Sequence, residues 1–163
     1  MPRMEWFAYI DPLAVFWGLL TALGLSVAAG IVIAIAMGLD MSRQWGRMIR
    51  DIEDERELEK LEERFDEQVD EHFEHDLASP AMLWALLVIS LLVNVLAGYV
   101  AAWQTRSAEP IGAWVNAGVV GLAGILLSAL LDRDPPIMPT RLRWLWYLLA
   151  IPTALAGAWL ALR

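Results

Sequence analysis

Charged residues are confined to parts of this chain, and four long stretches contain none. These stretches cover residues 12–39, 77–105, 110–131 and 144–162. A helix rises about 1.5 Å per residue, so about 20 residues cross the hydrocarbon core of a bilayer. The mean hydropathy of +0.49 and the 58% share of hydrophobic residues exceed those of water-soluble domains. The sequence therefore predicts an all-α, polytopic membrane protein built as a bundle of four transmembrane helices.

Prolines and charges divide the chain into seven expected segments. Asp11, Ser79 and Glu109 each precede a proline and can cap the helix that follows, because proline suits the first position of a helix. The expected segments are an outer interfacial segment at 1–11, spans at 12–39, 79–105, 110–131 and 144–163, an acidic segment at 40–78, and a proline-rich loop at 132–143.

The basic residues predict the orientation of these spans. Of the 12 Lys and Arg residues, only Arg3, Arg106 and Arg163 lie outside the acidic segment and the proline-rich loop. Because the cytoplasmic side of a membrane protein carries the excess of Lys and Arg, both termini are expected outside. We expect a multi-pass protein of the cell (inner) membrane with residues 40–78 in the cytoplasm. Aromatic residues near the cytoplasmic ends of the spans are expected as interfacial anchors, namely Trp45, Trp84, Trp144, Trp146 and Tyr147.

The acidic segment gives the whole chain its net charge of −8, since it holds 15 acidic and 6 basic residues. Glu, Arg, Leu and Lys dominate it, which predicts a long cytoplasmic helix. A change in the phase of its apolar positions predicts an elbow near residues 53–57. The part beyond the elbow carries an apolar stripe that must be covered, either by self-association or by another protein such as a basic cytoplasmic partner. The stripe consists of Leu58, Leu61, Phe65, Val69, Phe73 and Leu77.

The end of the acidic segment also contains candidate metal ligands. Glu71 with His75, and His72 with Asp76, are four residues apart, so each pair would share one face of a helix. A transition-metal site, diffuse attraction of Mg²⁺ or Ca²⁺, and an ordinary solvated surface remain open here. No other cofactor is expected. The absence of Cys excludes disulfides and thiolate chemistry, and the acidic balance disfavours nucleic-acid binding.

Small residues at intervals of four predict close packing of helices. This pattern favours packing within the bundle or between copies over the lining of a channel. In the first span it comprises Ala14, Gly18, Ala22, Ser26, Gly30, Ala34 and Gly38. Shorter versions in the other spans include Gly98, Gly121 and Gly157.

Three polar residues within the spans are candidate functional residues, namely Ser90, Asn94 and Asn116. An unpaired amide in hydrocarbon costs several kcal/mol, so Asn94 should face protein or water. We expect it to make an interhelical hydrogen bond, with a permeation or ligand role as the alternative. Asn116 lies nearer the outer surface, where we expect water to satisfy it.

Residues 97–163 contain the segments AGYVAA, VNAGVVGLAGILLSALL and YLLAIPTALAGAWLALR. In these segments the chain resembles a group of small four-span bacterial membrane proteins without an assigned activity. The resemblance implies a four-span fold and supplies no catalytic or ligand residues. The plan of an outside N-terminus followed by one span and a cytoplasmic helical segment is also similar to that of YidC-type insertases. That similarity would imply a basic residue in an intramembrane groove, which the predicted spans lack.

These features favour a non-enzymatic membrane scaffold or accessory subunit that contacts lipid and forms a homo-oligomer or joins a membrane complex. No Ser–His–Asp spacing, phosphate loop or HExxH motif favours an enzyme. One alternative is an oligomeric cation channel or divalent-ion-responsive channel regulator, in which Ser90, Asn94 and Asn116 face a pore. A membrane-protein insertase-like factor is a further alternative.

Overall fold

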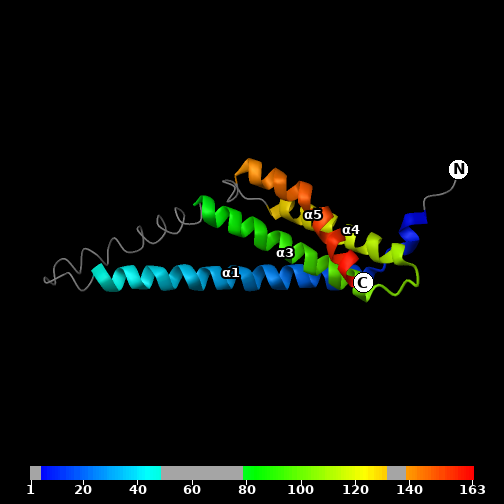
Figure 1. The fold of residues 1–163 in the computed structure, drawn as a ribbon, viewed down its shortest axis with the longest axis horizontal. Coiled ribbons are helices and arrows are strands. Elements are labelled where there is room, and N and C mark those ends of the chain that lie inside the picture. The colour runs from blue at the N-terminus through cyan, green and yellow to red at the C-terminus, as the bar shows by residue number, and fades with distance from the viewer. Residues whose placement is uncertain (1–4, 49–78, 132–138) are drawn as a thin grey trace. The chain divides into compact units, whose positions relative to one another are not determined.

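A computed structural model describes residues 5–48, 79–131 and 139–163. These residues form a short 3₁₀ helix, η1 (Glu5–Tyr9), and four α-helices: α1 (Pro12–Met48), α3 (Pro80–Gln104), α4 (Pro110–Leu131) and α5 (Thr140–Ala161) (Figure 1). Each of the four α-helices contains a stretch long and apolar enough to cross a membrane. The prediction of a helical protein with four candidate spans is confirmed. The acidic segment from residue 49, including the expected elbow, lies outside the described residues.

Side-chain caps begin two of the helices. The Asp11 Oδ1 atom accepts hydrogen bonds from the backbone N–H groups of Leu13 (3.0 Å) and Ala14 (3.4 Å) at the start of α1. Ser79 Oγ accepts one from the Met82 N–H (3.3 Å) at the start of α3. These are the N-caps that the Asp-Pro and Ser-Pro pairs predict, because such caps satisfy amide groups that the first turn leaves unpaired.

Two helices extend beyond the boundaries expected from charge. Helix α1 continues past its candidate span, which ends at Leu39, through Met48. Helix α5 begins at Thr140, four residues before the charge-free stretch that starts at residue 144. The physical reason is that charge alone does not end a helix, whereas Pro139 immediately precedes the first turn of α5.

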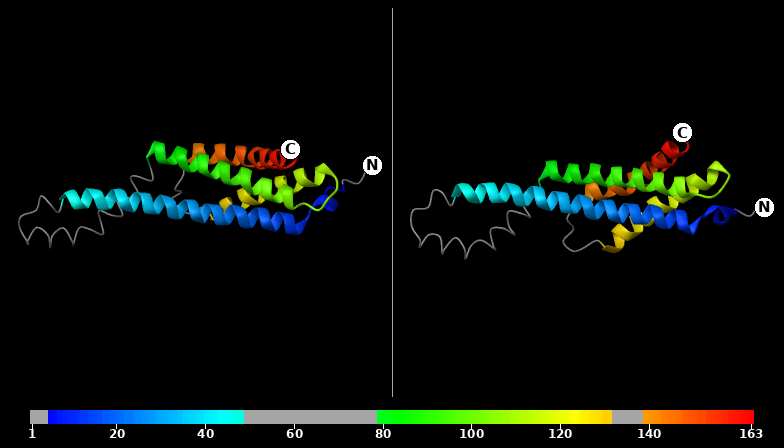
Figure 2. Two further views of the ribbon diagram at one scale, coloured as in Figure 1. Left: turned by 60° about the horizontal axis from the view of Figure 1, so that its bottom comes forward. Right: turned by 90° about the horizontal axis from the view of Figure 1, so that it is seen from below.

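The chain divides into two compact units. The first contains Met1–Val27 and Trp84–Arg163, and the second contains Ala28–Leu83. Within the first unit, α3 and α5 run side by side in the same direction, and α4 runs against them (Figures 1 and 2). The buried core of this unit is made mostly of alanine, including Ala97, Ala101, Ala117 and Ala158.

Glycines allow the backbones of α3 and α5 to touch. A Cβ atom added to Gly98 would overlap the backbone of Ala154, and one added to Gly157 would overlap the backbone of Val95 and Tyr99. Gly121 of α4 is also close, since its Cβ would lie 3.1 Å from that of Ala154. The close approach expected at these three glycines is therefore found, and it provides the van der Waals contact that membrane helices use to associate.

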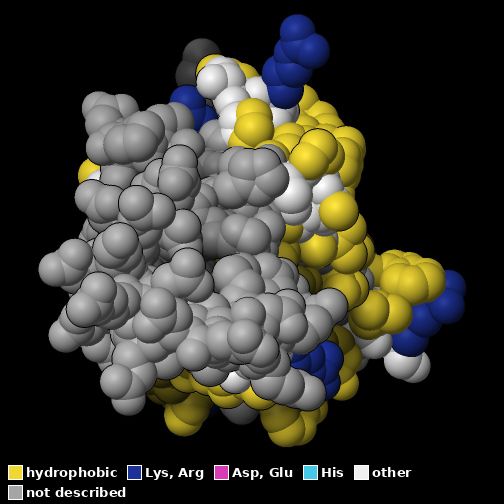
Figure 3. Space-filling view, turned by 90° about the vertical axis from the view of Figure 1, so that its left-hand side faces the viewer, with side chains coloured by type: hydrophobic (Ala, Val, Ile, Leu, Met, Phe, Trp, Pro, Cys, Tyr) yellow, Lys and Arg dark blue, Asp and Glu magenta, His cyan; other side chains and the backbone are white. Residues whose placement is uncertain are grey.

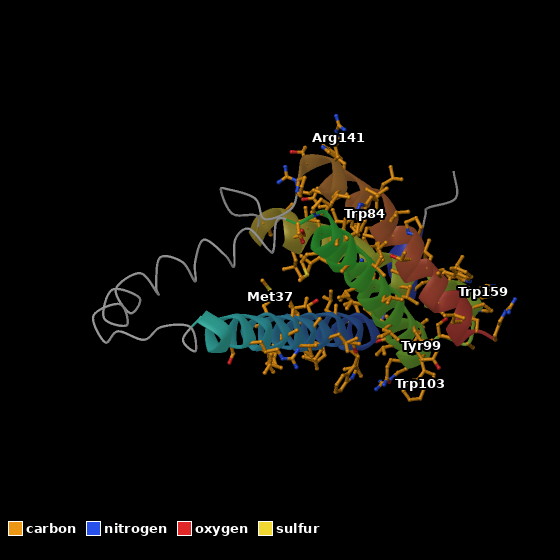
Figure 4. All side chains as sticks on the ribbon, turned by 60° about the vertical axis from the view of Figure 1, so that its left-hand side comes forward. Met37, Trp84, Tyr99, Trp103, Arg141 and Trp159 are labelled. Carbon is orange, nitrogen blue, oxygen red and sulfur yellow. The ribbon has the colours of Figure 1, made fainter. Side chains whose placement is uncertain are left out.

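The outward surface of the described helices is apolar. Leu130, Leu148 and Trp103 are among the most exposed large side chains. Hydrophobic side chains cover much of the described surface in Figure 3, with Lys and Arg at its margins. Tyr99, Trp103 and Trp159 lie toward one end of the first unit, while Trp84 and Arg141 lie toward the other (Figure 4). This distribution is typical of a helix bundle with an aromatic girdle at each interface.

Candidate functional site

A polar junction closes the end of the first unit where η1, α1, α3 and α4 meet. Its centre is Asn116, whose side chain is 0% exposed. The Asn116 amide nitrogen donates to Gly112 O (2.9 Å), Thr105 Oγ1 (3.0 Å) and Tyr9 O (3.2 Å), and its oxygen accepts from the Asp11 N–H (2.8 Å). Protein groups therefore satisfy this amide, and the expectation that water would do so is wrong. The reason is that η1 and the start of α1 cover it.

Asp11 extends the same junction toward α4. Its Oδ2 atom accepts a hydrogen bond from the Arg106 N–H (3.3 Å), while Oδ1 caps α1. Burial of the carboxylate raises the pKa of Asp11, but the N–H groups of Arg106, Ala14 and Leu13, with the Arg106 charge, outweigh it. The pKa is thus lowered from 3.8, and the carboxylate is charged at neutral pH. Asn116 and Asp11 therefore join η1, the start of α1, α4 and the segment that follows α3.

A cavity of about 180 Å³ lies deeper in the first unit, between α1, α3, α4 and α5. Most of its wall is apolar. Four polar side chains also line it, from Ser26, Ser90, Asn94 and Ser128. The apolar lining residues are Leu19, Ala22, Leu23, Val93, Val120, Gly124, Leu127 and Trp146. An apolar cavity with a few polar groups is the usual form of a small-molecule site.

Asn94 is the unusual member of this cavity wall. Its side chain is only 5% exposed, and its Nδ2 atom is buried without a hydrogen-bond partner among the described residues. The interhelical hydrogen bond expected of Asn94 is therefore not found at this nitrogen. The nearby Ser90 hydroxyl donates to Leu86 O (2.8 Å) in its own helix, and its oxygen does not accept from the Asn94 nitrogen. An unpaired buried donor costs about 1–3 kcal/mol, so this amide is a candidate binding group.

The first-span stripe of small residues falls into three environments. Ala14 and Gly18 are buried, and a Cβ on Gly18 would lie 2.9 Å from Ala101 Cβ of α3. Ala22 and Ser26 line the cavity. Gly30, Ala34 and Gly38 belong to the second unit. Within that unit, a Cβ on Gly30 or Gly38 meets no described atom within 4 Å.

Trp146 differs from two of the other expected anchors, Trp84 and Trp144. It is half-buried and lines the cavity, whereas Trp84 and Trp144 are exposed. All three lie near a helix end, which predicts an interfacial anchor for each. Sequence periodicity alone does not distinguish a position that faces lipid from one that closes a cavity.

Two predicted sets lie outside the described residues. They are the apolar stripe from Leu58 to Leu77 and the metal-ligand candidates Glu71, His72, His75 and Asp76. Within residues 5–48, 79–131 and 139–163, no group of three or more His, Cys, Asp or Glu side chains is arranged to hold a metal ion.

The polar junction has only a partial signal in the sequence. Asp11 is recognisable as a helix cap, but nothing local indicates that its N–H meets a side chain 105 residues further along the chain. Thr105 and Arg106 carry no motif either. Their role follows from where the turn between α3 and α4 lies, which is a property of the fold.

The described residues contain four α-helices that are long and apolar enough to cross a membrane, and the first unit holds a polar junction and a largely apolar cavity. No protein-family model, curated protein or solved structure matches the chain.

Proposed function

We propose that this protein is a non-enzymatic integral membrane scaffold or accessory subunit. Its four helices would lie in the cell (inner) membrane with both termini outside. The acidic segment would then lie in the cytoplasm, where it would self-associate or recruit a basic partner. Four candidate spans and an outward apolar surface support membrane insertion.

The observation that carries this proposal is the unbroken course of α1. Beyond Leu39, the end of its candidate span, the helix continues through Asp40–Met48. Nine further residues extend a helix by about 13 Å. A helical stem of this kind would hold the rest of the acidic segment, from residue 49 onward, clear of the headgroups, where another copy or a second protein can reach it.

The groups described in the first unit support a structural role. Asn116 and Asp11 bind other parts of the same chain, and glycines bring α3, α4 and α5 into contact. These interactions make the four-helix body a support for the segment that follows the stem. The apolar stripe of Leu58–Leu77 is the surface that we expect to mediate association, because the burial of apolar area favours it.

The proposal is tested with a stripe variant of the full chain, in which Leu61, Phe65, Val69 and Phe73 are all changed to Ala. Its matched control changes Glu63, Glu67, Asp70 and Glu74 to Ala, on the opposite face of the predicted helix. The mass in mild detergent is measured by light scattering, and the proteins that remain bound after purification from native membranes are identified.

We expect the stripe variant to lose mass or a bound protein while the control keeps both. Loss in the acidic control alone would instead favour a basic partner held by charge. If both variants keep the mass and the bound proteins of the parent, the scaffold proposal is wrong.

A cation channel or channel regulator is a weaker second proposal. The polar groups of Ser90 and Asn94 at the cavity favour it. Asn116 argues against it, because its amide is fully used within the junction and cannot line a pore. Planar-bilayer currents that disappear with Asn94→Leu would support the channel.

A further inference from the structure

We propose that the cavity beside Asn94 binds a membrane-soluble molecule with an apolar body and one carbonyl oxygen. The inference goes beyond the scaffold proposal and does not depend on the acidic segment. It concerns only the first unit, to which every residue that lines the cavity belongs.

The unpaired amide of Asn94 determines the polar end of this ligand. Its Nδ2 atom is a buried donor without a described partner, so the missing group is a hydrogen-bond acceptor. Its Oδ1 atom points toward Gly124, which also lines the cavity, because a Cβ on Gly124 would lie 3.7 Å from it. The last side-chain torsion of Asn is soft and roughly two-fold, so a rotation that exchanges the oxygen and the nitrogen turns the donor toward a ligand in the cavity.

The rest of the wall determines the apolar end. Leu19, Leu23, Val93, Val120 and Leu127 surround the space, and Trp146 adds an aromatic ring. An apolar cavity of about 150 Å³ accommodates a benzene molecule. The volume of about 180 Å³ here therefore holds one substituted ring or a short alkyl chain. Walls of this kind favour dispersion contact over a cluster of water.

The position of Asn94 along α3 distinguishes two sources of the carbonyl group, namely the ester of a bilayer lipid and a freely dissolved molecule. Asn94 lies 14 residues after Pro80 and 10 before Gln104, so it is about 15 Å from the nearer end of the helix. The ester carbonyls of bilayer lipids lie at the interface and not at this depth. A freely dissolved ketone or quinone-like molecule reaches Asn94 more readily, and we assign the site to that source.

The test uses the full chain in lipid nanodiscs and two probes of the same shape. One is para-fluoroacetophenone, and the other is para-fluoro-α-methylstyrene, in which a CH₂ group replaces the carbonyl oxygen. Fluorine NMR follows their binding, and empty nanodiscs correct for partition into lipid. We expect the ketone to bind about tenfold more tightly, as one buried hydrogen bond implies. The Asn94→Leu variant should lose this preference.

A second pair of variants tests the location without altering Asn94. Gly124→Leu should fill the cavity and abolish saturable binding of both probes. Gly118→Leu is the matched control on the same helix, since Gly118 lies outside the cavity wall and its Cβ would be 3.8 Å from Leu155 Cδ2. It should bind both probes as the parent does.

Competition identifies the source of the carbonyl group. A short-chain benzoquinone should displace the ketone probe, whereas a short-chain phosphatidylcholine should not. Displacement by the phospholipid alone would overturn the assignment to a freely dissolved molecule. The whole proposal fails if the parent protein shows no saturable binding, if it binds the two probes equally, or if Asn94→Leu keeps the preference for the ketone.

Discussion

Two asparagines of the first unit show how far environment determines the role of one residue type. Asn116 makes four hydrogen bonds to protein groups, although its place near the end of a span predicts contact with water. Asn94 is predicted to bridge helices, yet its Nδ2 atom has no described partner. Both are at least nine-tenths buried. A buried amide stabilises a fold only where its hydrogen bonds are made. The Asn116 side chain should therefore stabilise the folded protein, and the Asn94 side chain should destabilise it.

The same substitution at both positions tests this contrast. Asn116→Leu would leave the Asp11 N–H unpaired and remove the hydrogen bonds to Tyr9 O and Thr105 Oγ1, and we expect it to lower the free energy of unfolding by about 2–4 kcal/mol. Asn94→Leu removes an unpaired donor and should leave stability unchanged or raise it by about 1 kcal/mol. Thermal unfolding of the purified protein in detergent measures both. Equal losses at the two sites would contradict the assigned environments.

At the scale of the helices, the spacing of small residues predicts close packing but not which glycines are essential. Gly98 and Gly157 lie against the backbone of a neighbouring helix, whereas a Cβ added to Gly24 of α1 would have no described atom within 4 Å. All three belong to apolar helices of similar composition. The difference arises from how the helices cross, which the intervals of four do not specify.

Glycine-to-alanine substitutions distinguish these environments. Gly157→Ala would push a methyl group into the backbone of Val95 and Tyr99, and we expect a loss of about 1–3 kcal/mol of unfolding free energy. Gly24→Ala meets open space and should gain up to about 1 kcal/mol, because alanine favours the helix over glycine. Chemical unfolding followed by helical circular dichroism reports both effects. A stabilised Gly157→Ala protein would argue against the contact between α3 and α5.

At the scale of the whole molecule, charge and hydropathy are enough to predict an all-helical chain with four candidate spans. The charge-free stretches alone do not mark the ends of α1 and α5, because charged residues such as Asp40 and Arg141 are compatible with a helix once it leaves an apolar region. The cavity is also beyond prediction, since Leu19, Asn94 and Trp146 come from three different helices. Long-range packing of this kind leaves no periodic trace in a single sequence.

The proposed orientation can be tested directly because the natural chain has no Cys. Ser42 lies in α1 beyond its candidate span, and Ser107 lies between α3 and α4; both are exposed. In intact cells, a membrane-impermeant maleimide should label Ser107→Cys and leave Ser42→Cys unlabelled until the membrane is opened. Labelling of both positions from the same side would overturn the proposed topology.

The hydrogen bonds of Asn116 also restrict the order of events during synthesis. Tyr9 and Asp11 emerge 107 and 105 residues before this asparagine, so both must wait until the beginning of α4 has been made. Until then, the Asp11 N–H lacks the side-chain oxygen to which it donates in the folded protein. Closure around Asn116 is therefore expected only after the first turns of α4 have been made, which places it after the insertion of the preceding helices.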